Sequence, residues 1–347
     1  MTNKTELMNT LLEYIKIDSE TGNEEKICAK VKADLEALGL SVRELGDAQS
    51  LGTLSAVLRG DEAKPPIILC AHLDTVIPGV GIKALLCEDG YLRSEGHTIL
   101  GGDDKSGVAA IMEALRTVIK EKLPHRTLQI LFTVREEAGL FGSRVVTPED
   151  LIAKNAVVFD SSGDVGKIIT SAPGQMKLTA TITGLSAHAG NAPEKGISAI
   201  LVGASALESM KLLRIDEETT ANIGSFVATG PTNIISEKAE LVFEIRSRST
   251  EKLQHQADHM IEKLESACAK AGARLDYKLD VSHLGYALNP QAPLIKELFA
   301  ACEKIGVKPY TFASGGGSDA NNFNQMGITA VNVATGMEQV HSTQEQL

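Results

Sequence analysis

Continuous apolar runs alternate along the first part of the chain with segments whose apolar residues recur every three or four positions. PPIILCAHLDTV (65–76), TLQILFTV (127–134) and AVVFDSS (156–162) are such runs, and they are typical of strands covered on both faces. From Ser106 to about Lys122 the apolar residues share one helical face. The alternation predicts an α/β domain with a mostly parallel sheet flanked by helices.

The helix that begins near residue 25 is preceded by the segment TGNE. Thr21 and Glu24 have the spacing of a capping box, in which each side chain would bond the backbone N–H of the other residue. We therefore expect a helix that begins at this box and ends near Gly39.

The pattern changes after about Pro173. MKLTATITG (176–184) and AELVFEIRSRS (239–249) alternate apolar and polar residues, as half-exposed antiparallel strands do. From 176 to about 284 the expected order is strand, helix, strand, strand, helix, strand, a βαββαβ unit. The first pattern returns after about Pro290. We therefore expect a domain of residues 1–173 and 286–347 with a ferredoxin-like domain, 174–285, inserted into it.

Composition and charge exclude several classes of partner. Hydrophobic residues make up 43% of the 347, and 45 Asp and Glu against 34 Lys and Arg give a formal charge of −11. This balance argues against nucleic acid and membrane partners, since both need a basic face, and no apolar run reaches the length of a membrane span. Five cysteines without a CxxC pair favour reduced thiols and a cytoplasmic location.

Acidic and histidine residues gather where the apolar strands of the larger domain end. In open α/β sheets, ligands bind at the carboxyl ends of the strands. Each cluster alone has a structural interpretation, such as a hydrogen-bonded histidine or a helix N-cap. Together, buried acids beside strands need a neutralising cation or proton. The clusters are AHLDTV with His72 and Asp74, LGGDDKSG with Asp103 and Asp104, VREEAG with Glu136 and Glu137, VVFDSSG with Asp160, and MEQVHST with His341.

The donor types in these clusters indicate a metal. Imidazole nitrogen and carboxylate oxygen suit zinc. There are more carboxylates than one ion needs, which suggests two ions about 3.5–4 Å apart, bridged by one carboxylate and one water. His255 and His259 lie four apart in a helical segment, but HQADH lacks the Glu of HExxH, so we favour a solvated helix face there.

The ordered set HLDTV, LGGDDKSG, REEAG, strand-end Asp and late His resembles the co-catalytic zinc peptidases that include peptidase T, aminoacylase and succinyl-diaminopimelate desuccinylase. The resemblance spans nearly the whole chain. The GDDK segment, Asp160 and SGGGSDAN are most similar to the peptidase T branch, the tripeptide aminopeptidases. The sequence ends at Leu347, whereas family members usually continue through another helix.

The resemblance implies a zinc-exopeptidase-like catalytic domain with two Zn²⁺, for which Co²⁺ or Mn²⁺ could substitute. It implies that Asp103 bridges the ions and that Asp74 orients His72 through the second ring nitrogen. Glu136 would be the general base that activates the zinc-bridging water and then protonates the leaving amine. The implied ligands are His72, Asp103 and Asp160 for one zinc, and Asp103, Glu137 and His341 for the other.

The resemblance also gives roles to the inserted domain, which would act as a lid and dimerisation domain. His188 in GLSAHAG would stabilise the oxyanion, and Arg246 in FEIRSRS would grip the substrate carboxylate. Asn233 resembles a position near the substrate backbone. Outside the inserted domain, the glycine run of SGGGSDAN, with Gly316 and the following Ser318, would expose backbone N–H groups at a helix start that suit an anionic substrate end. A glycine run alone is equally typical of a flexible turn.

We expect the protein to be a metallo-aminopeptidase that removes the N-terminal residue of short peptides, tripeptides in particular. An N-acyl-amino-acid or dipeptide amidohydrolase with the same metal chemistry is the alternative. A non-catalytic peptide-binding protein on the same fold is a remote alternative, because a binder would not need Glu136 beside Glu137. The expected partners are a small peptide and a second copy bound through the lid.

Overall fold

The computed structural model describes residues 3–46 and 52–347, and the chain divides into two compact units. Unit 1 comprises Met1–Ser171, Leu288–Ser314 and Ser318–Leu347. Unit 2 comprises Ala172–Ala287 and Gly315–Gly317. The inserted domain expected at 174–285 lies within unit 2, which extends it by two residues at each end and by one glycine segment.

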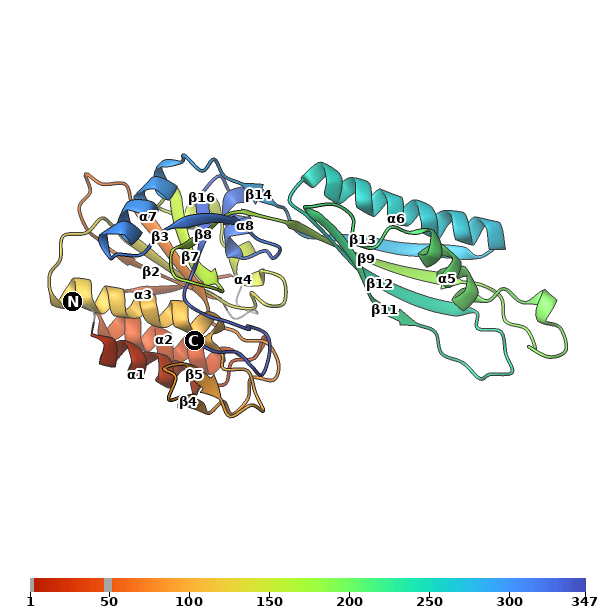
Figure 1. Ribbon diagram of the computed structural model, residues 1–347, viewed down its shortest axis with the longest axis horizontal. Helices are drawn as coiled ribbons and strands as arrows, with labels where there is room; N and C mark the ends of the chain where they lie inside the picture. Colours follow the sequence, from red (N-terminus) through yellow and green to blue (C-terminus); the bar gives the residue numbers. More distant parts are fainter. Residues whose placement is uncertain (1–2, 47–51) are drawn as a thin grey trace. The chain divides into compact units, whose positions relative to one another are not determined.

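Unit 1 holds eight strands of a nine-stranded mixed sheet in the order β1-β2-β6-β3-β7-β16-β8-β14, with β15 paired to β8, and the two-residue strand β14 falls in unit 2 (Figure 1). The central strands β6, β3, β7 and β16 are mutually parallel, and antiparallel pairs lie outside them. The sheet strands are β1 (Val42–Leu45), β2 (Thr53–Leu58), β3 (Ile67–His72), β6 (Leu128–Thr133), β7 (Asn155–Ser161), β8 (Lys167–Ala172), β14 (Tyr286–Ala287), β15 (Tyr310–Ala313) and β16 (Thr329–Ala334). A separate hairpin pairs β4 (Ala84–Leu86) with β5 (Leu92–Ser94).

Helices cover both faces of this sheet, as the continuous apolar strands predict. One face packs against α1 (Lys4–Ile15), α2 (Glu25–Ala37) and α3 (Gly102–Lys120), whose apolar residues form one core with those of β2, β3 and β6. The other face carries α7 (Pro293–Lys304), where Leu294 and Ile295 pack on β7, β8 and β16. Two short helices, α4 (Phe141–Arg144) and α8 (Asp319–Gln325), contact each other. The α/β fold with a mostly parallel central sheet is confirmed.

The prediction of a capping box before α2 (Glu25–Ala37) is wrong. The helix begins at Glu25, and its N-cap residue Glu24 makes no side-chain capping bond. The Thr21 hydroxyl instead donates to the Asp74 carboxylate at 2.8 Å, and Glu24 Oε1 accepts from the Arg135 backbone N–H at 3.1 Å. Both side chains therefore support loops at the carboxyl end of the sheet, because those loops offer partners that local spacing cannot reveal.

Unit 2 is a five-stranded antiparallel sheet in the order β10-β11-β12-β9-β13. Without the short β10, the four long strands lie side by side in the order β11-β12-β9-β13. Numbered along the chain, this order is 2-3-1-4, which is the strand order of a ferredoxin-like fold. The strands are β9 (Gly174–Thr183), β10 (Leu213–Arg214), β11 (Thr219–Val227), β12 (Lys238–Ser247) and β13 (Arg274–His283), and the helices are α5 (Ala199–Ser209) and α6 (Thr250–Ala271).

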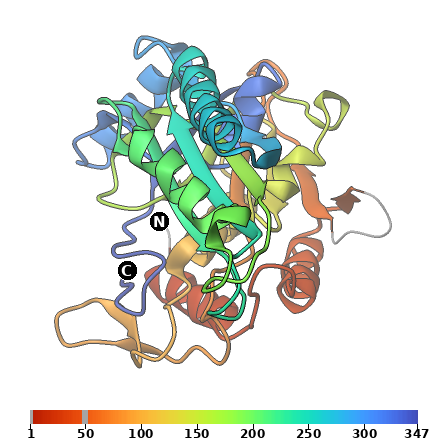
Figure 2. The same ribbon diagram turned by 90° about the vertical axis from the view of Figure 1, so that its right-hand side faces the viewer.

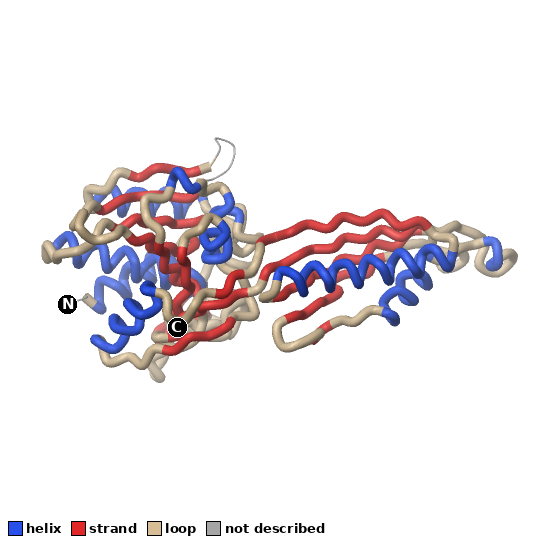
Figure 3. The backbone as a smooth tube through the Cα atoms, turned by 90° about the horizontal axis from the view of Figure 1, so that it is seen from above, coloured by secondary structure: helices blue, strands red, loops and turns tan. Residues whose placement is uncertain are grey.

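Both helices of unit 2 pack on one face of its sheet, against β9 and β12 (Figures 2 and 3). Alternate residues of β9 and β12 face the helices, and Leu178 and Phe243 belong to this core. Helix α6 begins at the N-cap Ser249, whose hydroxyl accepts from the Lys252 N–H, and ends at Gly272 with φ of 73°. Within residues 3–46 and 52–347, no helix has both the length and the apolar character needed to cross a membrane.

Candidate metal centre

The acidic and histidine clusters of unit 1 meet at the carboxyl end of its parallel strands. His72 is the last residue of β3, and Glu136 and Glu137 follow β6 by three and four residues. Asp160 is the penultimate residue of β7, and His341 lies in the segment after β16. Because parallel strands end at the same edge, residues distant in sequence come together there.

Asp103 lies between the two histidines. Its Oδ1 is 3.1 Å from His72 Nε2, and its Oδ2 is 3.2 Å from His341 Nε2. His341 Nε2 is also 2.8 Å from Glu137 Oε1, and His72 Nε2 is 3.6 Å from Asp160 Oδ1. The two oxygens of one carboxylate thus point to two separate sets of donors.

Two groups of donor atoms within this cluster could each hold a cation. One group is His72, Asp103 and Glu137, and the other is His72, Asp104 and Asp160. Asp104, which is not among the ligands that the resemblance implies, is fully buried, and its Oδ2 accepts from the His72 backbone N–H at 3.1 Å. Its Oδ1 has no hydrogen-bond partner among the described residues. Asp104 therefore fixes the end of β3 and lies within reach of a cation.

The buried carboxylates of the cluster need positive charge beside them. Bonds with Asp103 and Glu137 raise the pKa of His341 to about 10. Burial favours neutral His72, but hydrogen bonds with Asp103, Asp160 and Asp74 outweigh it and raise that pKa well above the ordinary value. Burial also raises the pKa of Asp160 to about 7. Without cations, protons on the imidazoles and carboxylates provide the neutralisation that buried acids require.

The donor set fits divalent zinc. The His72 ring places Nδ1 3.0 Å from the Asp74 carbonyl oxygen. A carbonyl only accepts, so Nδ1 carries a proton, and Nε2, which faces Asp103 and Asp160, is the ring atom that could bind a cation once its own proton is lost. Two imidazole nitrogens with several carboxylates are ligands that zinc takes in proteins.

Asp74 holds three segments of the site together. Its Oδ1 accepts from the Glu136 N–H at 2.9 Å, and its Oδ2 accepts from the Glu137 N–H at 3.2 Å. Its Oδ1 also lies 3.4 Å from His72 Nδ1, farther than its own carbonyl oxygen. The buried Asp74 carboxylate therefore positions the loop that carries Glu136 and Glu137, whereas the Asp74 carbonyl oxygen is the nearer partner of the His72 ring.

Glu136 is 8% exposed and adjoins the donor cluster. Burial, reinforced by the negative charges of Asp160, Asp319 and Glu137, raises its pKa well above the ordinary value. A buried carboxyl group whose affinity for protons is raised in this way is suited to accept a proton and to return it.

Sequence reasoning missed a buried acid behind the cluster. Asp319, 1% exposed at the start of α8, accepts from the Thr133 hydroxyl at 2.6 Å and lies 3.9 Å from the Cys70 thiol. It thereby joins α8 to the ends of β6 and β3. The only sequence signal was its place after the glycine run, which gives no indication of burial.

The residues expected in the lid lie in unit 2, and two of them are neighbours. His188 forms a bridge with Ile234, and the Ala189 N–H bonds the Asn233 carbonyl. Nδ1 of the exposed His188 accepts from the backbone N–H groups of Gly190 and Asn191, both at 3.1 Å. The neutral ring therefore carries its proton on Nε2, which makes that atom a hydrogen-bond donor.

Arg246, near the end of β12, contacts the glycine segment Gly315–Gly317. Arg246 Nε donates to Glu244 at 2.7 Å, and Arg246 Nη1 donates to the Gly315 carbonyl at 3.4 Å. Gly316 belongs to unit 2, whereas Ser318 belongs to unit 1. Ser318 is 2% exposed and forms a capping box with Asn321 at the start of α8. Its hydroxyl is thus committed to the helix.

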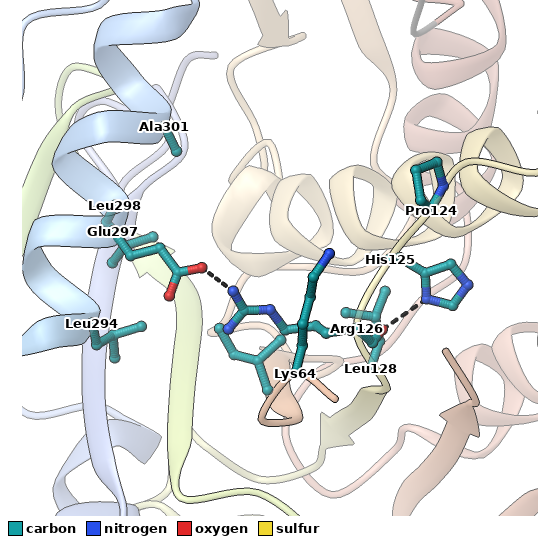
Figure 4. A pocket seen from close by; sticks show the side chains of 10 residues that line it. Lys64, Pro124, His125, Arg126, Leu128, Leu294, Glu297, Leu298 and Ala301 are labelled. Carbon is teal, nitrogen blue, oxygen red and sulfur yellow. Dashed lines mark hydrogen bonds and ion pairs between the residues drawn. The ribbon is translucent and has the colours of Figure 1, made fainter. Parts of the chain in front are cut away.

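A cavity of about 370 Å³ lies at the amino-terminal ends of the central strands of the unit 1 sheet (Figure 4). Ile67 and Leu128, the first residues of β3 and β6, line it together with Leu294 of α7. An ion pair between Arg126 and Glu297 crosses it. The cavity is therefore separate from the metal centre, which lies where the same strands end.

Comparisons with known proteins show the family of the chain and the solved structures that it resembles. The sequence profile of peptidase family M20/M25/M40 matches residues 68–347. The uncharacterized protein YqjE of Bacillus subtilis is 40% identical over all of this chain and 94% of its own length. A tripeptidase from Staphylococcus aureus has a TM-score of 0.96 at 37% identity, and aminopeptidase PepT from Bacillus cereus has 0.91 at 39%. Each alignment covers all of this chain and 94% of the solved chain.

Proposed function

The chain belongs to peptidase family M20/M25/M40, and we propose that it is a tripeptide aminopeptidase with two zinc ions. The family membership makes it a peptidase, as the sequence predicts. Similarity to a tripeptidase and to aminopeptidase PepT, at 37% and 39% identity, supports the proposed tripeptide aminopeptidase activity.

The observation that carries the two-ion proposal is the position of Asp103. Its carboxylate oxygens lie 3.1 and 3.2 Å from the Nε2 atoms of two different histidines. A carboxylate placed in this way can serve two cations at once. His72, Asp103 and Asp160 would hold one zinc, and Asp103, Glu137 and His341 would hold the other.

Bound zinc would supply Lewis acidity to the scissile carbonyl and would make a neighbouring water easier to deprotonate. The Glu136 carboxylate accepts the proton of the attacking water and delivers it to the leaving amine. Asp74 keeps Glu136 in place through the bond to its backbone N–H. These residues all belong to unit 1, which we propose as the catalytic domain.

Unit 2 would supply the groups that recognise the substrate. Nε2–H of His188 is suited to donate to the oxyanion, since Nδ1 is already occupied as an acceptor. The Arg246 guanidinium, steadied by Glu244, would bind the peptide carboxylate. Asn233 would contact the substrate backbone, and the backbone of Gly316 would bind an anionic substrate end. The Ser318 side chain caps α8, so we assign only its backbone to such a contact.

A substrate panel tests the proposed activity. Purified protein loaded with Zn²⁺ or Co²⁺ is offered di-, tri- and tetrapeptides and N-acylated amino acids, and the products are identified by mass spectrometry. We expect release of the N-terminal residue with the highest kcat/KM on tripeptides. Preferential cleavage of N-acyl amino acids or dipeptides would assign an amidohydrolase activity instead, and no hydrolysis of any of these substrates would contradict the proposal.

A further inference from the structure

A buried carboxylate near the end of the chain contacts the loop that presents Asp103. Glu345 is 1% exposed. Its Oε2 accepts from the backbone N–H groups of Leu100 and Gly101, both at 2.9 Å, and its Oε1 accepts from the Asp103 N–H at 3.0 Å. Both oxygens are therefore used, and all three donors precede the regular part of α3.

These three N–H groups depend on a side-chain acceptor. Gly101 has φ of 74°, and Asp103 has φ of −80° and ψ of 107°, so the backbone here is not helical. The N–H groups at the start of a helix have no intrahelical partner, and hydrogen bonds to a carboxylate are stronger than those between neutral groups. Glu345 is thus the acceptor that fixes the backbone on both sides of Gly102.

The segment that carries Glu345 also carries His341. Glu338 and Gln346 exchange both backbone hydrogen bonds, at 2.9 and 3.0 Å, and close the segment into a loop. Leu347 makes the same paired contact with Leu92. One closed loop therefore contacts Asp103 twice: at the carboxylate through His341, and at the backbone N–H through Glu345.

We propose that Glu345 is a positioning residue that sets the distance between the bridging carboxylate of Asp103 and the imidazole of His341. The inference rests on the proposed two-zinc function. It assigns Glu345 no contact with substrate or zinc. Its effect passes through the Asp103 backbone, so loss of the carboxylate lowers zinc affinity and turnover while the substrate groups of unit 2 stay unchanged.

The test compares Glu345→Gln with Glu338→Gln. Glu338 lies on the same loop and accepts from the Gln346 side chain, not from the Asp103 loop, so it controls for the loss of charge. Zinc affinity is measured by competition with a chromophoric chelator, and kcat and KM are measured on a tripeptide. For Glu345→Gln we expect zinc affinity to fall roughly 10- to 100-fold, with lower kcat, and KM within about threefold of wild type. Glu338→Gln should match wild type.

Circular dichroism and thermal unfolding of the metal-free variants show whether they fold. If Glu345→Gln does not fold, Glu345→Asp carries the test, because it keeps the charge but is one methylene too short to reach all three donors. Unchanged zinc affinity and kcat in a folded variant would overturn the inference and leave the proposed function standing. Failure of the wild-type protein to bind zinc would overturn the proposed function itself.

Discussion

The side chains of the metal centre differ in what their surroundings allow them to do. Glu136 and Glu137 are adjacent in sequence, and both donate a backbone N–H bond to the Asp74 carboxylate. Only the Glu137 carboxylate bonds a histidine, at 2.8 Å. Glu136 is left with a buried carboxylate among negative charges, which raises its pKa. The division of roles between neighbouring acids therefore follows from position.

Glu136→Gln should separate proton transfer from metal binding. The amide keeps the size of the side chain but cannot accept a proton, so we expect roughly 10²- to 10⁴-fold lower kcat with unchanged zinc content. Turnover on a tripeptide and elemental analysis of the same samples measure both. Glu149→Gln, the same change on an exposed residue, is the control. Turnover near the wild-type value would rule out Glu136 as the general base.

His188→Ala tests the role proposed for unit 2. The two backbone bonds to Nδ1 leave Nε2 as the donor, and loss of one oxyanion donor typically lowers kcat roughly 10²- to 10³-fold. We expect that loss with unchanged zinc content, because His188 lies outside unit 1. His255→Ala, at an exposed position of α6, should leave kcat unchanged. If both variants turn over alike, His188 has no part in the reaction.

The sequence predicts the residues that form the metal centre better than the residues that support them. His72, Asp103, Asp160 and His341 stand beside apolar strands or in distinctive segments, so their types and places are informative. Asp319 and Glu345 make their contacts through tertiary structure, with partners 186 and 242 residues away. No local pattern carries that information.

At the scale of elements, the start of α2 shows how tertiary contacts override local signals. Thr21 and Glu24 have the spacing of a capping box, yet both side chains bond loops of the metal centre. Helix α2 instead is held by its buried face, where Ile27, Cys28 and Val31 pack into the core of unit 1. Burial of that face outweighs the missing cap, since tertiary packing supplies most helical stability in proteins.

The buried face of α2 should make the protein less stable at alkaline pH. Burial, with the negative charges of Glu24 and Glu44, raises the pKa of Cys28 to about 12, whereas an unfolded thiol ionises near pH 8.5. Between these values the unfolded chain binds fewer protons than the folded one. The free energy of unfolding therefore falls as pH rises, by up to about 1.4 kcal/mol per pH unit for this group.

Equilibrium urea unfolding at pH 8.5 and 10.5 measures this loss. Cys28→Ala should lose roughly 2 kcal/mol less than wild type over the interval, while Cys87→Ala, on a half-buried thiol, should behave like wild type. Parallel losses in wild type and Cys28→Ala would mean that the thiol ionises equally in the folded and unfolded chains.

At the scale of the whole molecule, two hydrophobic periodicities distinguish the two units. Continuous apolar strands run through the covered sheet of unit 1, and alternating strands build unit 2, where one sheet face packs on α5 and α6. This contrast is why the α/β class and the βαββαβ order are predictable from the sequence. The small hairpin β4–β5 and the membership of Gly315–Gly317 in unit 2 are not, because they depend on contacts between distant segments.

The central claim is that one unit holds two zinc ions with Asp103 between them, and metal stoichiometry tests it most directly. Metal-free protein is titrated with Zn²⁺ while binding is followed by calorimetry. We predict saturation at two ions per chain in a preparation that hydrolyses tripeptides. Saturation at one ion or none in such a preparation would contradict the claim.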